Sequence, residues 1–249
     1  MTGRAPLAAA LAAALLLVPA CGGGGRKADR IVVGTEATYQ PFEFKDGNGA
    51  ITGFDIELVR AVAREAGLEA EFVDQPFVGL IPGLQQGKYD AAVSCITITP
   101  ERARAVDFTE GYYEAGQVVA VPERDAATRG VQDLRGKTIA VQQGTTGNDA
   151  ARKVEGATVK AFDSTDMAFM ELLAGRADAV INDEPTTRLY ARDHPGLRVA
   201  GSPFTEENYG IAVKKGSALL ARLNEGLRKV RASGEHARLK AKWIEGAGR

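Results

Sequence analysis

One eight-residue pattern occurs twice in this chain, at residues 84–91 (LQQGKYDA) and at residues 172–179 (LLAGRADA). Each copy reads as the end of a helix, a glycine stop, a basic residue and then Asp-Ala at the start of an apolar strand. Polar residues close both strands at matching offsets, Ser94 in the first and Asn182-Asp183 in the second. The two octads by themselves would fit a chance match between ordinary turns equally well, but the repetition favours two similarly built α/β lobes.

The wider pattern of strands and helices predicts how those lobes are built. Strands are expected at 31–34, 69–73, 90–94, 137–142, 158–162 and 177–181, and helices at 54–66, 80–86, 148–154, 163–174 and 219–230. Their alternation predicts parallel sheets with crossover helices. Since ligands of open α/β sheets bind beyond the carboxyl ends of the strands, the polar strand ends of the two lobes are expected to face each other across a cleft.

The length of 249 residues suits one large or two small domains. We expect lobe 1 to be discontinuous, formed by residues 29–115 and 206–249, with lobe 2 formed by residues 116–205. The chain would then cross between the lobes twice, at hinges near Glu114–Gln117 and Thr205–Tyr209. Two crossings permit closure by hinge motion.

The N-terminus is a candidate targeting segment. Arg4 precedes an apolar stretch from Leu7 to Val18, so residues 1–20 are predicted to be a secretory signal peptide. Cys21 and the glycines after it resemble a bacterial lipoprotein cleavage site, which predicts lipidation of Cys21 and a Gly-rich tether over 21–29. The alternative is a simple cleaved signal, because Val18 and Pro19 depart from the usual lipoprotein pattern. We therefore expect an extracytoplasmic protein held at the bacterial cell membrane by an N-terminal lipid anchor.

Composition and motifs exclude several other classes of function. A formal net charge of -1 argues against a nucleic-acid partner. His194 and His236 are isolated and lack metal-ligand spacing, and the sequence contains no nucleophile motif. We therefore predict no catalytic residue, no metal site and no cofactor. If Cys21 carries lipid, Cys95 has no partner for an internal disulfide.

The segment from Thr97 to Arg102 is the sharpest local signal. Thr99 is a good N-cap and Pro100 a good first helical residue, so Arg102 falls in the first turn of a helix. A cation at that pole opposes the helix dipole unless an anion joins it, which predicts a carboxylate site. The alternative is a solvated Arg102 paired with Glu101 or Asp107.

Three further groups are candidates on the same reasoning. The loop from Gln142 to Gly147 joins a strand to a helix, and its amides, with Thr146 at the helix start, would cradle an anion. Asp183 would hold an ammonium group or, alternatively, cap the helix after Pro185. Aromatic residues lie in or beside loops that follow strands; Tyr39 and Phe77 are candidates to sandwich an aliphatic side chain, whereas Phe42 is expected in the core.

Taken together, these segments resemble the polar amino-acid family of extracytoplasmic solute-binding proteins, family 3, which serve ABC importers. The matching stretches are 34–44, 53–58, 94–102 with 106–108, 143–147, 177–185 and 209–213. The resemblance implies a two-lobed α/β fold of the periplasmic-binding-protein type II, with a hinged interlobe cleft that closes on one amino acid. It also implies the permease subunits of an ABC importer as partners, and we expect the protein to be a monomer.

The resemblance assigns roles to individual residues. Arg102 would hold the α-carboxylate of the ligand, helped by the backbone amides of Thr97 and Thr146. Asp183 would hold the α-ammonium, helped by the Cys95 carbonyl and the Thr97 hydroxyl. Tyr39 and Phe77 would flank the ligand side chain, whose tip would meet Glu36, Ser94, Gln142 and Asn182. Cys95 stands where Gly or Ser is expected, and Glu36 where Asp is common.

The residue at the tip predicts the ligand. Glu36 would repel an acidic side chain and attract a basic one, so arginine, lysine or histidine is expected, with glutamine second because Gln142 and Asn182 can bond an amide. The enzyme alternative is a cyclohexadienyl or arogenate dehydratase on the same scaffold, with Glu36 or Glu184 as general acid. The residues that would hold the α-carboxylate and the α-ammonium of a ligand are both present, which favours a binding protein. A sensory ectodomain is disfavoured because no membrane span or signalling domain follows.

Overall fold

The computed structural model describes residues 1–3 and 29–246. The predicted signal peptide, Cys21 and the tether up to residue 28 therefore lie outside the described residues. Within the described ranges, no helix has both the length and the apolar character needed to cross a membrane.

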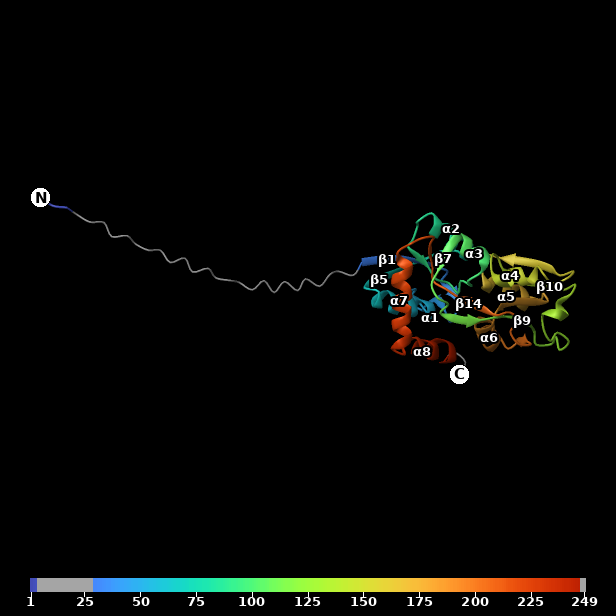
Figure 1. Cartoon of the computed structure of the whole chain (residues 1–249). Coiled ribbons are helices and arrows are strands. Elements are labelled where there is room, and N and C mark those ends of the chain that lie inside the picture. The colour runs from blue at the N-terminus through green and yellow to red at the C-terminus, as the bar shows by residue number, and fades with distance from the viewer. Residues whose placement is uncertain (4–28, 247–249) are drawn as a thin grey trace.

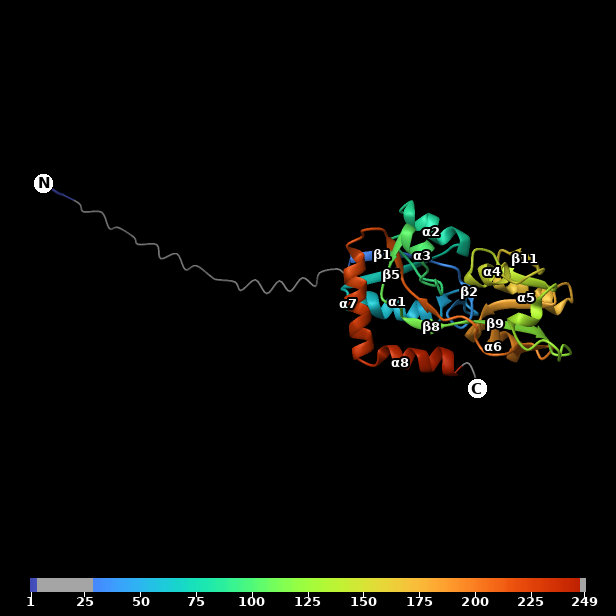
Figure 2. The same ribbon diagram turned by 45° about the vertical axis from the view of Figure 1, so that its right-hand side comes forward.

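Two five-stranded sheets form the framework (Figures 1 and 2). The strand order in the first is β5 (Leu68–Asp74), β1 (Asp29–Thr35), β6 (Ala91–Ala92), β15 (Ala212–Lys214) and β7 (Val106–Phe108). The order in the second is β11 (Thr158–Phe162), β10 (Thr138–Gln142), β12 (Ala179–Asp183), β9 (Gln117–Pro122) and β13 (Leu197–Ala200). The two sheets are thus built alike, which confirms the two-lobed α/β fold.

The prediction of purely parallel sheets was wrong for one strand in each sheet. The first three strands of both sheets are parallel, but β15 and β9 run antiparallel to both neighbours. These two strands enter their sheets directly from the short strands β14 (Glu207–Tyr209) and β8 (Tyr113–Ala115). They do not follow a crossover helix, so nothing requires them to run parallel.

The repeated octads occupy equivalent places in the two sheets. The first ends helix α2 (Phe77–Gln85) and opens β6, and the second ends helix α5 (Thr165–Leu173) and opens β12. Gly87 and Gly175 stop the helices with left-handed φ angles of 72° and 69°, a conformation that glycine adopts without strain. The aspartates of the octads, Asp90 and Asp178, each accept a backbone N–H from the adjacent parallel strand, from Val32 of β1 at 2.8 Å and from Thr138 of β10 at 2.7 Å.

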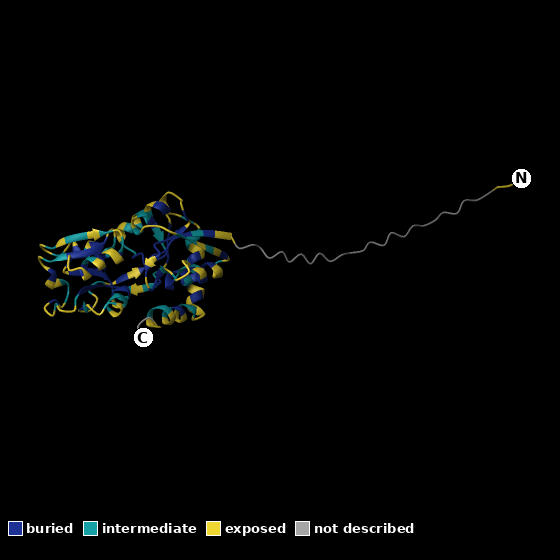
Figure 3. Ribbon diagram, turned by 180° about the vertical axis from the view of Figure 1, so that it is seen from behind, coloured by how far each residue is buried: buried dark blue, intermediate teal, exposed yellow. Residues whose placement is uncertain are grey.

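Helices cover both sheets and bury separate apolar cores (Figure 3). The first sheet carries α1 (Phe54–Glu65), α2, α7 (Leu219–Ala232), α8 (Glu235–Lys240) and a π-helical turn (Ala241–Glu245). The second carries α4 (Thr146–Ala151), α5, α6 (Glu184–Asp193) and a 3₁₀ turn (Val131–Leu134). Phe42 is fully buried and packs edge-on against Phe54 and Tyr209, which confirms its expected place in the core.

Two small sheets complete the fold. The strands β8 and β14 pair with each other, within the segments where the sequence predicts hinges. The strands β2 (Thr38–Tyr39), β3 (Glu43–Lys45) and β4 (Ile51–Thr52) form a hairpin-like sheet that precedes α1. The exact lobe boundaries, at residues 115/116 and 205/206, stay a prediction.

Candidate functional site

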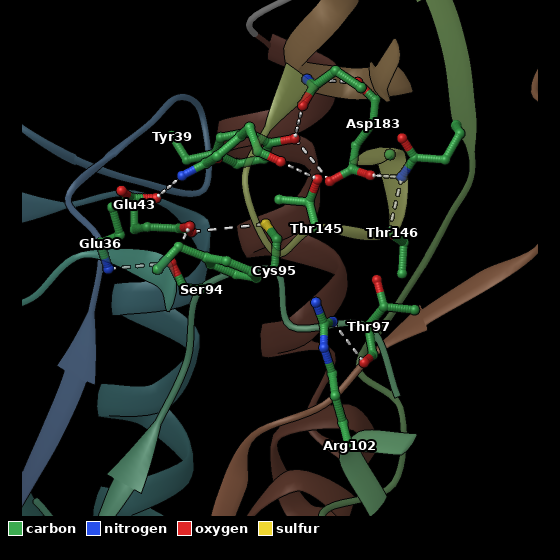
Figure 4. Close-up of a pocket in the computed structure, with 15 residues that line it drawn as sticks. Glu36, Tyr39, Glu43, Ser94, Cys95, Thr97, Arg102, Thr145, Thr146 and Asp183 are labelled. Atoms are coloured by element: carbon green, nitrogen blue, oxygen red, sulfur yellow. Dashed lines mark hydrogen bonds between the residues drawn. The ribbon is translucent and has the colours of Figure 1, made fainter. Parts of the chain in front are cut away.

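All eleven residues expected to bind a ligand line one pocket between the two large sheets (Figure 4). The pocket has about 370 Å³ of empty space, part of it open to solvent. From the side of the first sheet it is lined by Glu36, Tyr39, Phe77, Ser94, Cys95, Thr97 and Arg102, and from the side of the second by Gln142, Thr146, Asn182 and Asp183. Most of these residues follow or end strands, as the topology of open sheets requires.

Arg102 lies in the first turn of the short helix α3 (Pro100–Ala105), as predicted, and the Thr99 hydroxyl caps that helix by accepting the Arg102 N–H at 3.2 Å. Its guanidinium donates to the Thr97 carbonyl and, across the cleft, to the Gly144 carbonyl, both at 3.0 Å. The alternative pairing with Asp107 does not occur, because Asp107 pairs with Lys215 at 2.8 Å. The guanidinium is therefore presented to the pocket with carbonyl oxygens as its partners.

Asp183 ends β12 and precedes α6, but its side chain makes no capping hydrogen bond, so the alternative role as a helix cap is wrong. Its carboxylate accepts from the Tyr39 hydroxyl at 2.7 Å and from the Gln117 amide. Burial raises the pKa of Asp183 to about 6, the nearby charge of Glu207 adds to the rise, and the hydrogen bonds partly offset it. A buried carboxylate with a raised pKa is one that a cationic partner would stabilise.

A second acidic region lies at the first-sheet end of the pocket. Glu36 accepts from the Gln142 amide at 2.6 Å, and Ser94 donates to Glu43 at 2.9 Å. Burial raises the pKa of Glu36. Burial also raises the pKa of Glu43 well above its usual range, and the neighbouring Asp55 adds to that rise.

The donor atoms of Glu43, Asp55 and Cys95 lie within 4.8 Å of one another. Asp55 Oδ2 accepts from the Cys95 N–H at 3.0 Å and from the Tyr112 hydroxyl at 2.5 Å, and Glu43 accepts from Ser94.

Cys95 has a left-handed backbone, with φ of 46°, unlike every other non-glycine residue in the described ranges. This conformation costs an L-residue about 1 kcal/mol or more. It gives a physical reason why Gly is expected at this position. The backbone turns here so that β6 leaves its sheet and Ser94, Cys95 and Thr97 reach the pocket.

The backbone amides assigned to an anion are suitably placed. Thr97 forms an antiparallel bridge with Tyr209. The two hydrogen bonds of this bridge run from the Ile98 N–H to the Asn208 carbonyl at 2.8 Å and from the Gly210 N–H to the Ile96 carbonyl at 3.0 Å. The N–H of Thr97 therefore points away from β14. Thr146 is the first residue of α4, and Thr145 caps that helix by accepting the Asn148 N–H at 3.1 Å. The N–H groups of a first helical turn have no partner within the helix.

Four further residues line the pocket. Thr145 and Gly147 belong to the predicted anion-binding loop from Gln142 to Gly147, whereas Glu43 and Gln117 were missed. Both missed residues carried a signal. Glu43 stands between two phenylalanines, which marks an acidic residue in an apolar segment, and Gln117 opens the apolar run of β9 inside a predicted hinge. Glu207 was also missed, although it lies in the second predicted hinge.

Comparison with known proteins matches residues 31–246 to the model of the bacterial extracellular solute-binding proteins, family 3. The ABC transporter arginine-binding protein 1 of Escherichia coli is 37% identical, over 89% of this chain and 93% of the relative. A probable histidine-binding protein of Neisseria gonorrhoeae is 34% identical, over 96% and 94%. A solved structure of an ancestral arginine-binding protein bound to arginine is 41% identical, with a TM-score of 0.84, over 88% of this chain and 99% of that one.

Proposed function

This chain belongs to family 3 of the bacterial extracellular solute-binding proteins, and we propose that it captures a free basic amino acid and delivers it to an ABC importer. Arginine, lysine and histidine are the candidate ligands, with glutamine second. The named relatives are binding proteins of transporters, and the chain is accordingly a binding protein, not an enzyme of the dehydratase type.

The observation that carries the proposal is the charge of the pocket. Three carboxyl groups line it, those of Glu36, Glu43 and Asp183, against one cation, Arg102. Carboxyl groups thus outnumber cations in the lining. A basic side chain adds a cation that can pair with them, whereas glutamine adds no charge and glutamate adds a further carboxylate. Charges buried in a closed pocket are stable only when they are paired.

The distribution of the charges fits the two α-groups. Arg102 lies on α3, on the side of the first sheet, and Asp183 ends β12 of the second sheet. The groups assigned to the α-carboxylate and to the α-ammonium therefore lie on opposite sides of the pocket. A zwitterion would be held from both sides. The ligand thus gains contacts only in the closed arrangement, and binding favours closure by that difference in affinity.

The hydrogen bonds of Gln142 favour a basic ligand over glutamine. Its amide nitrogen donates to Glu36, and its amide oxygen accepts from the Thr165 hydroxyl at 2.8 Å. Gln142 therefore holds the Glu36 carboxylate in place and has little capacity left for an amide ligand. A fixed carboxylate is suited to a guanidinium or ammonium group.

The same proposal includes the location of the protein in the cell. Cys21 would carry a lipid that anchors the protein outside the cytoplasmic membrane, with residues 21–29 as the tether to a monomeric binding unit. Mass spectrometry of the membrane fraction tests this directly, because the C21A variant should be released into the soluble fraction without the lipid mass.

A panel of free amino acids in a thermal-shift assay tests the ligand. At 100 times its dissociation constant, a ligand stabilises the protein by about 2.7 kcal/mol, a shift of about 5–11 °C at this chain size. Arginine, lysine or histidine is expected to give the largest shift, with glutamine smaller and glutamate near zero. The largest shift from glutamate would contradict the charge argument, and no shift from any amino acid would contradict the function.

A further inference from the structure

We infer that Glu207, which does not line the pocket, is a positioning residue that latches the two lobes together when they close. The inference rests on the proposed capture of an amino acid by closure. Glu207 is the first residue of β14 and is only 8% exposed. None of the predicted ligand contacts includes it.

The carboxylate of Glu207 joins both sides of the cleft. Its Oε2 atom accepts from the Thr97 hydroxyl at 2.7 Å and from the Thr146 hydroxyl at 2.8 Å. Thr97 follows β6 of the first sheet, and Thr146 opens α4 against the second. One oxygen atom can reach both hydroxyls only while the two sheets are held together, so this pair of bonds belongs to the closed state.

The other contacts extend this bridge to the ammonium site. Glu207 Oε1 accepts from the Thr205 hydroxyl at 3.0 Å, and Thr205 in turn accepts the Gln117 N–H at 2.8 Å. The Gln117 side chain donates to Thr146 at 3.2 Å and to Asp183. A continuous hydrogen-bonded chain therefore runs from Asp183 through Gln117 and Thr146 to Glu207.

The latch also determines whether the hydroxyls of the two threonines can donate or accept hydrogen bonds towards a ligand. A hydroxyl has one proton to donate, and both threonines give theirs to Glu207. Towards the pocket, the oxygens of Thr97 and Thr146 can then act only as acceptors. An acceptor at the Thr97 hydroxyl, which is assigned to the α-ammonium, matches that group, so Glu207 would favour the correct orientation of an amino acid without touching it.

The latch should affect the dissociation rate of the ligand more than its association rate. Hydrogen bonds to a charged acceptor are stronger than neutral ones, and these form after the ligand has entered. Loss of the latch should therefore speed dissociation while leaving association nearly unchanged, as is usual for contacts made only in the final complex.

Exchange of labelled arginine from the purified full-length protein measures this. The E207Q variant, which keeps the shape but loses the charge, is expected to release arginine at least about tenfold faster than the wild type. Its association rate should stay within about threefold. The matched control is E206Q, since Glu206 is the exposed neighbour of Glu207, and its release rate should stay within about twofold.

A double-mutant cycle with T146V separates the latch from general damage. T146V should speed release in the wild-type background but add almost nothing in E207Q, because the partner of its hydroxyl has been altered. E207D keeps the charge but is too short to reach both threonines, so it should also release arginine faster, and it decides the matter if E207Q does not fold.

Two results would overturn the latch: release from E207Q within about twofold of the wild type, or effects of E207Q and T146V that multiply independently. Both presuppose that the wild type binds arginine. If the wild type binds no amino acid, the proposed function fails, which is a distinguishable outcome.

Discussion

Asp183 and Glu36 differ from surface carboxylates because each is buried and hydrogen-bonded from across the cleft, by Tyr39 and Gln142 respectively. Their residue type could be read from the sequence, but not their environment. Sequence reasoning left Asp183 open between an ammonium site and a helix cap. The direction of its side chain excludes a capping hydrogen bond, and no local pattern encodes that direction.

The Arg102 guanidinium gives a first prediction. R102A should weaken arginine binding by about 2–5 kcal/mol, because it leaves the α-carboxylate of the ligand buried and without its partner. Isothermal titration with arginine measures the loss. R104A is the matched control, since Arg104 is exposed on the same helix, and its affinity should be unchanged. Equal affinities of R102A and the wild type would show that the site is assigned wrongly.

The raised pKa of Asp183 predicts a pH dependence. In the free protein its pKa is about 6, and a bound ammonium group would lower it, so binding releases a proton. Affinity should therefore rise with pH through about 6 and level off above 7, with about a tenfold loss at pH 5. In the ligand-free protein the sign is opposite: a pKa raised above its unfolded value favours folding in acid, and that contribution is lost as the pH rises from about 4 to 6.

Titration calorimetry at pH 5, 6, 7 and 8 checks this prediction, in buffers of different ionisation enthalpy so that proton release is measured. The D183N variant should bind more weakly and should lose the step near pH 6. A step that persists in D183N would instead assign it to Asp55, whose pKa burial also raises to about 6.

At the scale of elements, the repeated octads predicted their own structure well. Local chemistry explains this, because a glycine stop and an aspartate that bonds the adjacent strand act over a few residues. The short strands β8, β14 and β15 were missed, since each is only three residues long and carries no periodicity. Their pairing is between residues about a hundred positions apart.

Helix packing in the first lobe gives an element-scale prediction. A Cβ atom at Gly226 of α7 would lie 2.3 Å from the Val62 carbonyl oxygen of α1, far inside van der Waals contact. G226A should therefore destabilise the protein by about 1–3 kcal/mol, although alanine favours helices by about 1 kcal/mol. Urea unfolding measures the change in the free energy of unfolding.

The control is G79A in α2, where the added methyl group meets nothing within 4 Å. That variant should be as stable as the wild type or more stable by up to about 1 kcal/mol. If G226A were also neutral, α1 and α7 would not pack as closely as the structure shows.

The whole molecule is in a closed arrangement. Hydrogen bonds cross the cleft from Tyr39 to Asn182 at 2.9 Å, from Gln142 to Glu36 and from Thr186 to the Gln40 carbonyl at 2.9 Å. Each joins a residue of one side to a residue more than a hundred positions away. Together with the hinge strands, these contacts hold the two sides together, and on the proposed function a ligand would raise the population of this closed state.

Small-angle scattering tests closure at this scale. Saturating arginine should reduce the radius of gyration of the wild type, whereas glutamate at the same concentration should leave it unchanged. The R102A variant should respond less, because it loses one of the two charges that draw the sides together. An identical radius with and without every amino acid tried would contradict closure as the mechanism of capture.

The sequence by itself determined the two-lobed α/β plan and all eleven predicted pocket residues, since motifs at strand ends and the family resemblance are both local in the chain. Tertiary structure alone decided that Glu43, Gln117 and Glu207 belong to the same network. The physical reason is that burial and hydrogen bonding depend on what lies across the cleft, and those neighbours come from segments far apart in the sequence. The sequence shows only that these residues are acidic, whereas the folded chain determines which of their carboxyl groups are buried and which donors they accept from.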